Sequence, residues 1–73
     1  MSGMAKRANG KSGPELLMSW RHRRDVTQET LARRVGVAQG TLCSWERGSR
    51  RPRIQLALKL EEITGIPVRA WAA

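Results

Sequence analysis

The sequence has 73 residues, a length that suits one small domain with a modest hydrophobic core. Lysine and arginine together number 14 against 6 acidic residues, so the formal net charge is +8 and the sequence pI is near 11.6. A domain this basic is expected to bind a polyanion. Eleven of the basic residues are arginine, whose planar guanidinium suits forked contacts with phosphates and guanine edges.

Composition also excludes several classes of protein. The single cysteine, Cys43, leaves no internal disulfide and fits a reducing compartment. No apolar run approaches the roughly 18 residues of a membrane-spanning helix, and residues 1–13 lack the apolar stretch of a signal peptide. The only histidine, the only cysteine and the few acids form no acid–base or nucleophile pair. We therefore expect a cytoplasmic protein without enzyme activity, cofactor, metal, membrane contact or small-molecule substrate.

Residues 1–13 are rich in glycine, serine and charge and show no hydrophobic periodicity. This composition predicts a segment that is disordered on its own, and the plainest interpretation is an unstructured leader that includes a cloning remnant. The alternative is an arm in which Lys6, Arg7 and Lys11 follow phosphates or enter a minor groove beside the domain. Residues 14–73 form the expected folded domain.

A first helix is expected from Pro14 to about Arg24. Proline is preorganised for the first turn of a helix, and the acidic residue that follows it favours the positive end of the helix dipole. Leu17 and Trp20 recur at helical spacing and are expected to face the core.

The end of this helix carries four consecutive basic residues. Arg21 follows Trp20 on the inward side, so its guanidinium needs a buried partner. His22 is expected to be exposed, because the chain offers it no second metal ligand. Arg23 is interpreted as part of a solvated face.

The stretch from Gln28 to Gly48 is the feature around which the chain is organised. Apolar or small residues recur at helical spacing in both of its halves, namely Leu31, Ala32, Val35, Leu42 and Trp45. Gly36 lies between the halves, where a left-handed residue without a Cβ ends a helix and lets the chain reverse. Thr27 is expected to cap the first half. The pattern predicts two short helices joined by a tight turn, which is a helix-turn-helix unit.

The second helix of this unit, expected at residues 38–47, presents a polar surface. With its apolar residues facing inward, the residues left to face outward are Gln39, Gly40, Thr41, Cys43, Ser44 and Arg47. Amides read adenine edges, hydroxyls donate or accept, and methyl groups touch thymine, so this surface suits a DNA major groove. The alternative is an ordinary solvated helix face. For Cys43 we favour a small tolerated residue over a redox switch at the DNA surface.

A dense basic cluster follows this helix and consists of Arg47, Arg50, Arg51 and Arg53. At the end of a helix-turn-helix, such a cluster is expected to clamp phosphates rather than to form a solvated loop. Arg33 and Arg34 lie on the exposed side of the preceding helix. They are interpreted as soluble surface, with phosphate contact as the alternative.

A fourth helix is expected from about Ile54 to Thr64, and its broad apolar surface closes the core. Gly65 ends this helix, and Pro67 begins a last turn or short helix. Trp71 either seals the core, which we favour, or lies in a dimer contact. The predicted fold class is all-α.

Residues 16–71 resemble the phage-repressor and Cro family of helix-turn-helix DNA-binding domains, often called XRE-like. The resemblance rests on TQETLARRVGV, on the following segment that ends in SWERG, and on RRP before the fourth helix. It implies a lambda-repressor-like fold, which is a compact bundle of about five short α-helices. It also implies a small transcriptional regulator, usually a repressor, that binds double-stranded operator DNA as a dimer near the nucleoid of a bacterial or phage-infected cell.

Several residues match functional positions of this family. Gln28 matches a glutamine that contacts a backbone phosphate and supports base reading. Gln39 matches a principal base-reading glutamine, and Ser44 falls at a later base-reading position on the same face, which also carries Thr41.

The family also implies one ion pair, and the chain departs from the family at two positions. Arg21 and Glu46 match a pair that forms a buried salt bridge between the first and third helices, which implies a structural role for both. Ala38 stands where a serine or threonine often caps the second helix of the unit, which is the family's recognition helix. Alanine cannot form this cap, and the loss of stability is typically about 1 kcal/mol. Gly40 stands where another base-reading side chain is common. Either specificity is lost there, or the bare backbone lets the helix lie deeper in the groove.

Two other classes of function compete with this regulator. The antitoxin of a toxin–antitoxin pair has a similar DNA-binding part, but little of the chain is left for a segment that wraps a toxin. A nonspecific basic protein that binds nucleic acid or a membrane would fit the charge. Against it, the apolar residues are used in a core, and no aromatic stacking platform is evident.

Overall fold

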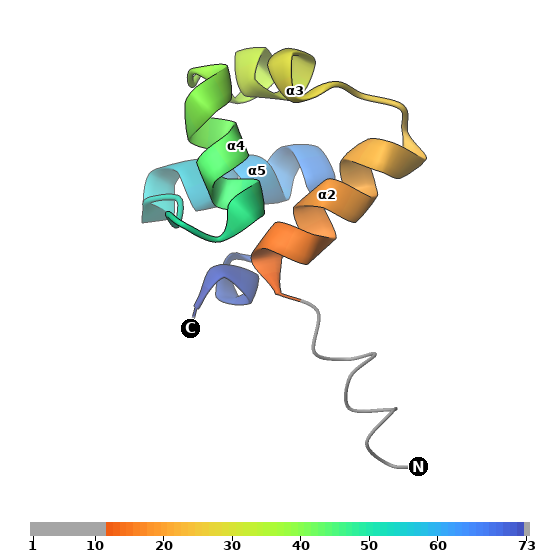
Figure 1. Cartoon of the computed structure of the whole chain (residues 1–73). Coiled ribbons are helices and arrows are strands. Elements are labelled where there is room, and N and C mark those ends of the chain that lie inside the picture. The colour runs from red at the N-terminus through yellow and green to blue at the C-terminus, as the bar shows by residue number, and fades with distance from the viewer. Residues whose placement is uncertain (1–11, 73) are drawn as a thin grey trace, which may run out of the picture.

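The computed structural model describes residues 12–72, which fold into four α-helices and one short 3₁₀ helix (Figure 1). In chain order these are α2 (Gly13–Arg23), α3 (Gln28–Val35), α4 (Gln39–Arg47), α5 (Ile54–Thr64) and the 3₁₀ helix η1 (Val68–Trp71). No strand occurs within residues 12–72, which confirms the all-helical prediction. The expected bundle of about five α-helices differs at its end, where the last element is a 3₁₀ helix. The expected leader or arm with Lys6, Arg7 and Lys11 lies outside the described residues.

Helix α2 begins at Gly13, one residue before the predicted start at Pro14. Ser12 is its N-cap residue, and the backbone N–H of Ser12 donates to Oε1 of Glu15 over 3.2 Å. Gly13 is buried against the indole of Trp71, and a Cβ at this position would overlap the ring. The first turn of α2 is therefore part of the folded domain and packs on η1.

The turn between α3 and α4 lies where the sequence predicts it. Thr27 caps α3, because its Oγ1 accepts a hydrogen bond from the backbone N–H of Thr30 over 3.1 Å. Gly36 ends α3 with a left-handed φ of 91°, and its N–H donates to the carbonyl of Ala32 over 2.8 Å. Gly48 ends α4 with a φ of 79°. A side chain at either glycine would strain the backbone.

The core lies where α2, α3 and α4 meet, and α5 and η1 close it (Figure 1). Its buried side chains are Leu17, Trp20, Leu31, Ala32, Val35, Leu42, Trp45, Ala57, Leu60, Ile66 and Trp71. Both Trp45 and Trp71 belong to this core, as expected. The apolar surface of α5 is narrower than predicted, because Ile54 and Leu58 are 61% and 51% exposed. None of the helices described is long and apolar enough to span a lipid bilayer.

Candidate nucleic-acid interface

Helix α4 turns one side to the core and the other to solvent. Its buried side chains are Leu42, Trp45 and Glu46, three and four positions apart, as the helical period requires. Of the predicted outward residues, Gln39, Gly40 and Arg47 are exposed, whereas Thr41, Cys43 and Ser44 are half-buried. The fold therefore gathers the predicted base-reading residues on one helix but does not expose them equally.

The N-terminus of α4 has no side-chain cap. Ala38 is the N-cap residue, and its φ of −72° and ψ of 153° are extended. No side chain accepts from the first turn, and no acidic residue lies in that turn. The first N–H groups and the positive end of the helix dipole are thus left without a side-chain partner, which favours an anion nearby.

Gly40 and Ser44 lie one turn apart on α4. A Cβ at Gly40 would meet no atom within 4 Å, so packing does not require glycine there. The hydroxyl of Ser44 donates to the carbonyl oxygen of Gly40 over 3.1 Å, which leaves the lone pairs of the hydroxyl able to accept. This part of the surface is bare at Gly40 and offers a hydrogen-bond acceptor at Ser44.

A buried ion pair joins α2 to α4. Nε of Arg21 donates to Oε2 of Glu46 over 2.7 Å, and Nη2 donates to Oε1 over 2.9 Å. The two side chains are only 12% and 3% exposed. Nη1 of Arg21 also donates to the carbonyl oxygen of Val26 over 3.1 Å. Glu46 is thus the partner that the inward position of Arg21 requires, and the pair is the one that the family resemblance implies.

Gln28 connects the first turn of α3 to this pair. Its Nε2 donates to Oε1 of Glu46 over 3.0 Å, so Glu46 accepts from both α2 and α3. Burial of the carboxylate raises the pKa of Glu46, but hydrogen bonds from Arg21 and Gln28 and the charge of Arg21 outweigh burial and lower it. The buried carboxylate therefore holds the amide of Gln28 beside α4.

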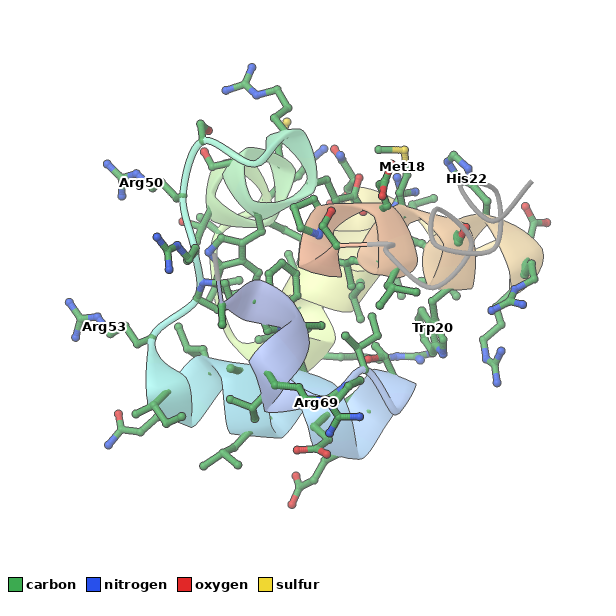
Figure 2. All side chains as sticks on the ribbon, turned by 90° about the horizontal axis from the view of Figure 1, so that it is seen from below. Met18, Trp20, His22, Arg50, Arg53 and Arg69 are labelled. Carbon is green, nitrogen blue, oxygen red and sulfur yellow. The ribbon has the colours of Figure 1, made fainter. Side chains whose placement is uncertain are left out.

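The segment after α4, residues 48–53, is called the arginine loop. Its exposed cations are Arg50, Arg51 and Arg53, with Pro52 buried between them. These four residues line a cavity of about 110 Å³ together with Thr41, Trp45 and Leu56. Figure 2 shows Arg50 and Arg53 extending away from the bundle. Thr41 therefore lies on the flank of α4 next to the arginine loop, and no ion pair neutralises these arginines within residues 12–72.

The other predicted residues are more widely distributed. Arg33 and Arg34 are exposed on α3, and Nη2 of Arg33 lies 3.8 Å from Oε2 of Glu29 in a pair whose side chains are both 71% exposed. Cys43 is a free, half-buried thiol on α4. His22 is exposed on α2, as predicted. No group of three or more potential metal ligands comes together within the described residues.

Sequence reasoning missed contacts at both ends of α2. The guanidinium carbon of Arg24 lies 4.9 Å from the ring centroid of Trp20, in a cation–π contact. Asp25 follows with a left-handed φ of 55°, a conformation that aspartate tolerates better than most residues. The start of α2 could have been predicted from the sequence, since the spacing of Ser12 and Glu15 is that of a capping box.

Comparison with known proteins identifies the two-helix unit and the surrounding bundle. The family model described as helix-turn-helix matches residues 17–71, which include α3, α4 and most of α2. The chain belongs to the helix-turn-helix family.

Two relatives of this helix-turn-helix chain carry regulatory names. It is 33% identical over 45 residues to the cryptic phage CTXphi transcriptional repressor RstR of Vibrio cholerae, an alignment that covers 62% of this chain and 40% of that protein. It is also 33% identical over 52 residues to the uncharacterized HTH-type transcriptional regulator MJ0272 of Methanocaldococcus jannaschii, covering 71% of this chain and 79% of that protein. The chain thus spans less than half the length of RstR. No solved structure matches it significantly. The family match is thus to a helix-turn-helix, and the names of both relatives describe regulators of transcription.

Proposed function

We propose that this chain binds double-stranded DNA sequence-specifically as a small transcriptional regulator, with α4 as the recognition helix in the major groove. The proposal rests on the residues that flank the polar side of α4. Its polar side is bordered on one flank by the arginine loop and on the other by Gln28, which Glu46 holds in place. The major groove admits an α-helix whose exposed amides and hydroxyls reach base edges, while phosphates lie on both sides of the groove.

Base reading is assigned to the outward side of α4. Gln39 is the principal base-reading residue, because its exposed amide lies in the first turn of α4 and a side-chain amide can form two hydrogen bonds with adenine. Thr41 contributes a hydroxyl and a methyl group on the flank beside the arginine loop. Ser44 acts as an acceptor, since its proton is directed to the carbonyl of Gly40. Gly40 itself offers only backbone.

Phosphate contacts are assigned to both flanks of α4 and orient the domain without reading sequence. On one flank, the contacts come from Arg47, Arg50, Arg51 and Arg53, all exposed. On the other, one Nε2 hydrogen of Gln28 is used by Glu46, and the second can donate to a phosphate oxygen. The two sets together fix the depth and direction of α4 in the groove.

The proposal includes a dimeric complex in which residues 14–73 act as the DNA-binding domain of each copy. Two copies on a two-fold symmetric operator would place their α4 helices about 34 Å apart, one turn of the double helix. A regulator that occupies such an operator across a promoter acts as a repressor. We place this activity in the cytoplasm, at the nucleoid of a bacterial or phage-infected cell.

Titration of labelled duplex DNA at two salt concentrations, with unlabelled competitors, tests the proposed function. A preferred sequence that competes at least about a thousandfold better than random duplex supports a sequence-specific regulator. Steep salt dependence without any preferred sequence would contradict it and indicate a nonspecific basic protein.

A further inference from the structure

We propose that Ser44 makes one position of the operator selective for a base that carries an exocyclic amine, adenine or cytosine, over guanine or thymine. The inference rests on the proposed function, because Ser44 lies on the side of α4 assigned to the major groove. It goes further by naming the class of base that the hydroxyl reads. Its structural basis is the hydrogen bond from Ser44 to Gly40, one turn earlier on α4.

The hydroxyl of Ser44 has a fixed hydrogen-bonding direction. Its single proton is donated to the carbonyl oxygen of Gly40 over 3.1 Å. A hydroxyl has one donor and two acceptor lone pairs, so the group that remains for a ligand is an acceptor. Bonding to the carbonyl four residues earlier is a usual arrangement for serine within a helix, and it needs no DNA to form.

The major groove offers two kinds of partner to such an acceptor. Adenine and cytosine present an exocyclic amine that donates, whereas guanine and thymine present an oxygen that accepts. An amine can donate to the hydroxyl of Ser44 while the bond to Gly40 stays in place. An oxygen there would face another acceptor, or the hydroxyl would have to turn and lose its bond to Gly40. The loss of one hydrogen bond corresponds to about a two- to tenfold change in affinity.

Gly40 leaves the hydroxyl open to a base edge. Side chains on a helix tilt toward its N-terminus, so that of Ser44 lies over the turn that contains Gly40 and Thr41. Gly40 is exposed, and a Cβ there would meet no atom within 4 Å. Thr41 lies on the flank beside the arginine loop. A base can therefore approach Ser44 across Gly40 without displacing a side chain.

The end of α4 holds the backbone of Ser44 in place. Its carbonyl oxygen accepts from the N–H of Ser49 over 3.0 Å, from the N–H of Arg50 over 3.4 Å and from the hydroxyl of Ser49 over 3.3 Å. These bonds fasten the start of the arginine loop to the residue that carries the reading hydroxyl. They also occupy the carbonyl oxygen, so the acceptor that Ser44 presents to a base is its side chain.

Selection of bound sites from random duplex DNA with the full chain identifies the position that Ser44 reads. It is the position at which the base preference differs between the wild type and Ser44→Ala. There the wild type should prefer adenine or cytosine on one strand over guanine and thymine by about two- to tenfold. Ser44→Ala should lose this preference and keep those at other positions. Ser44→Thr retains a hydroxyl that can bond the same carbonyl, so it should keep the preference.

Synthetic duplexes test the amine itself. At that position adenine is replaced by purine, or cytosine by 2-pyrimidinone, each of which lacks only the exocyclic amine. The wild type should lose about two- to tenfold more affinity than Ser44→Ala does, because the weakened base pair is common to both measurements.

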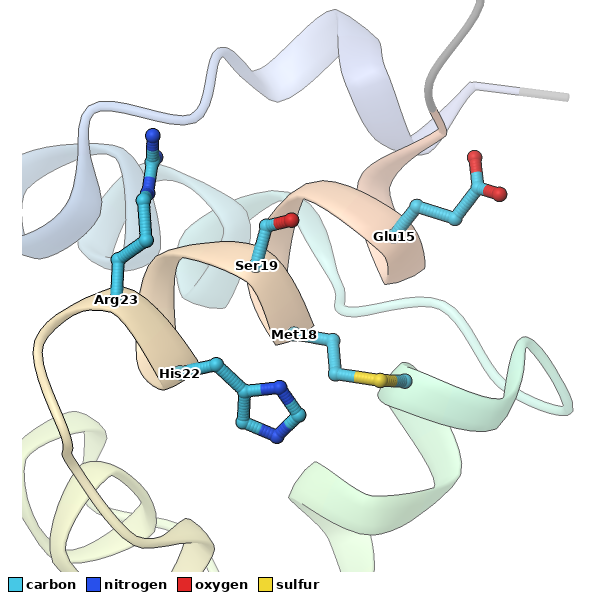
Figure 3. Close-up of a pocket in the computed structure, with 5 residues that line it drawn as sticks. All are labelled: Glu15, Met18, Ser19, His22 and Arg23. Atoms are coloured by element: carbon cyan, nitrogen blue, oxygen red, sulfur yellow. The ribbon is translucent and has the colours of Figure 1, made fainter.

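Ser19→Ala is the matched control for these measurements. Ser19 is also a half-buried helical serine, but it lies on α2, in a depression of about 380 Å³ that Met18 and His22 also line (Figure 3). This variant should respond to amine removal as the wild type does.

Two results would overturn the inference and leave the proposed function in place. One is an equal response to amine removal in the wild type and Ser44→Ala. The other is a preference dependent on Ser44 that separates A·T from G·C pairs whichever strand carries the purine. Absence of any preferred sequence for the wild type would overturn the proposed function as well.

Discussion

Two hydrogen bonds of 2.7 and 2.9 Å tie the guanidinium of Arg21 on α2 to the carboxylate of Glu46 on α4. The same carboxylate accepts from Gln28 at the start of α3. One buried side chain therefore joins α2, α3 and α4 and fixes the amide that we assign to a phosphate. Changes at Glu46 are expected to affect folding and DNA binding together.

Glu46→Ala should lower the free energy of unfolding by roughly 3–5 kcal/mol, because it leaves the buried guanidinium of Arg21 without its carboxylate. Thermal and urea unfolding measure the loss. Glu29→Ala is the matched control: it removes a carboxylate from a pair whose side chains are 71% exposed, and it should change stability by less than about 1 kcal/mol. Equal melting temperatures for the wild type and Glu46→Ala would show that the pair does not stabilise the fold.

Stability should decline in acid through the same carboxylate. The pKa of Glu46 is lower in the folded protein than in the unfolded chain, so its charged form stabilises the fold above the unfolded value of about 4.3. That contribution is lost as pH falls through the folded pKa. Urea unfolding at pH 7, 5 and 3 should therefore show the stability difference between the wild type and Glu46→Gln narrowing with acid. A constant difference would argue against a depressed pKa.

Gly40→Ala should raise the free energy of unfolding by about 0.8–1 kcal/mol, since alanine is the better helix former and a Cβ there meets no atom within 4 Å. Gly36→Ala is the contrasting control, because its φ of 91° strains any side chain, and it should destabilise. A melting temperature for Gly40→Ala at or below that of the wild type would contradict the prediction. A fall in the DNA affinity of Gly40→Ala despite its higher stability would favour the interpretation that the bare backbone at Gly40 lets α4 lie deeper in the groove.

Ala38→Ser should stabilise the protein by about 1 kcal/mol by supplying the missing cap of α4. The backbone at Ala38 is already extended, as an N-cap requires, and no side chain accepts from the first turn. Thermal unfolding of Ala38→Ser beside Ala38→Gly separates the hydroxyl from the backbone effect. If the two variants melt at the same temperature, the serine hydroxyl does not cap the helix.

Local signals in the sequence were sufficient to locate the helices. Gly36 and Gly48 both adopt the left-handed conformation that their positions predict, and Thr27 caps α3 with its side chain. The contact of Gly13 with Trp71 was missed, because it joins two residues that are far apart in the sequence and leaves no periodic trace. The start of α2 was consequently predicted one residue late.

The candidate site was only partly predictable from local signals in the sequence. The outward side of α4 followed from the inward spacing of Leu42 and Trp45, because two buried positions fix the orientation of a helix. The position of Thr41 beside the arginine loop depends on the path of residues 48–53, which no periodicity encodes. Glu46 as the partner of Arg21 came from the family resemblance, since sequence spacing alone does not join residues on two different helices.

Selection of bound sites from random duplex DNA, run in parallel with the wild type and Gln39→Ala, measures directly whether α4 reads sequence. Gln55→Ala, which removes an exposed glutamine from α5, is the matched control. We expect the wild type and the control to enrich one site by about a thousandfold over random DNA. Gln39→Ala should lose that preference while keeping its salt-dependent nonspecific affinity. Enrichment of the same site to the same extent by Gln39→Ala would contradict base reading by this residue of α4.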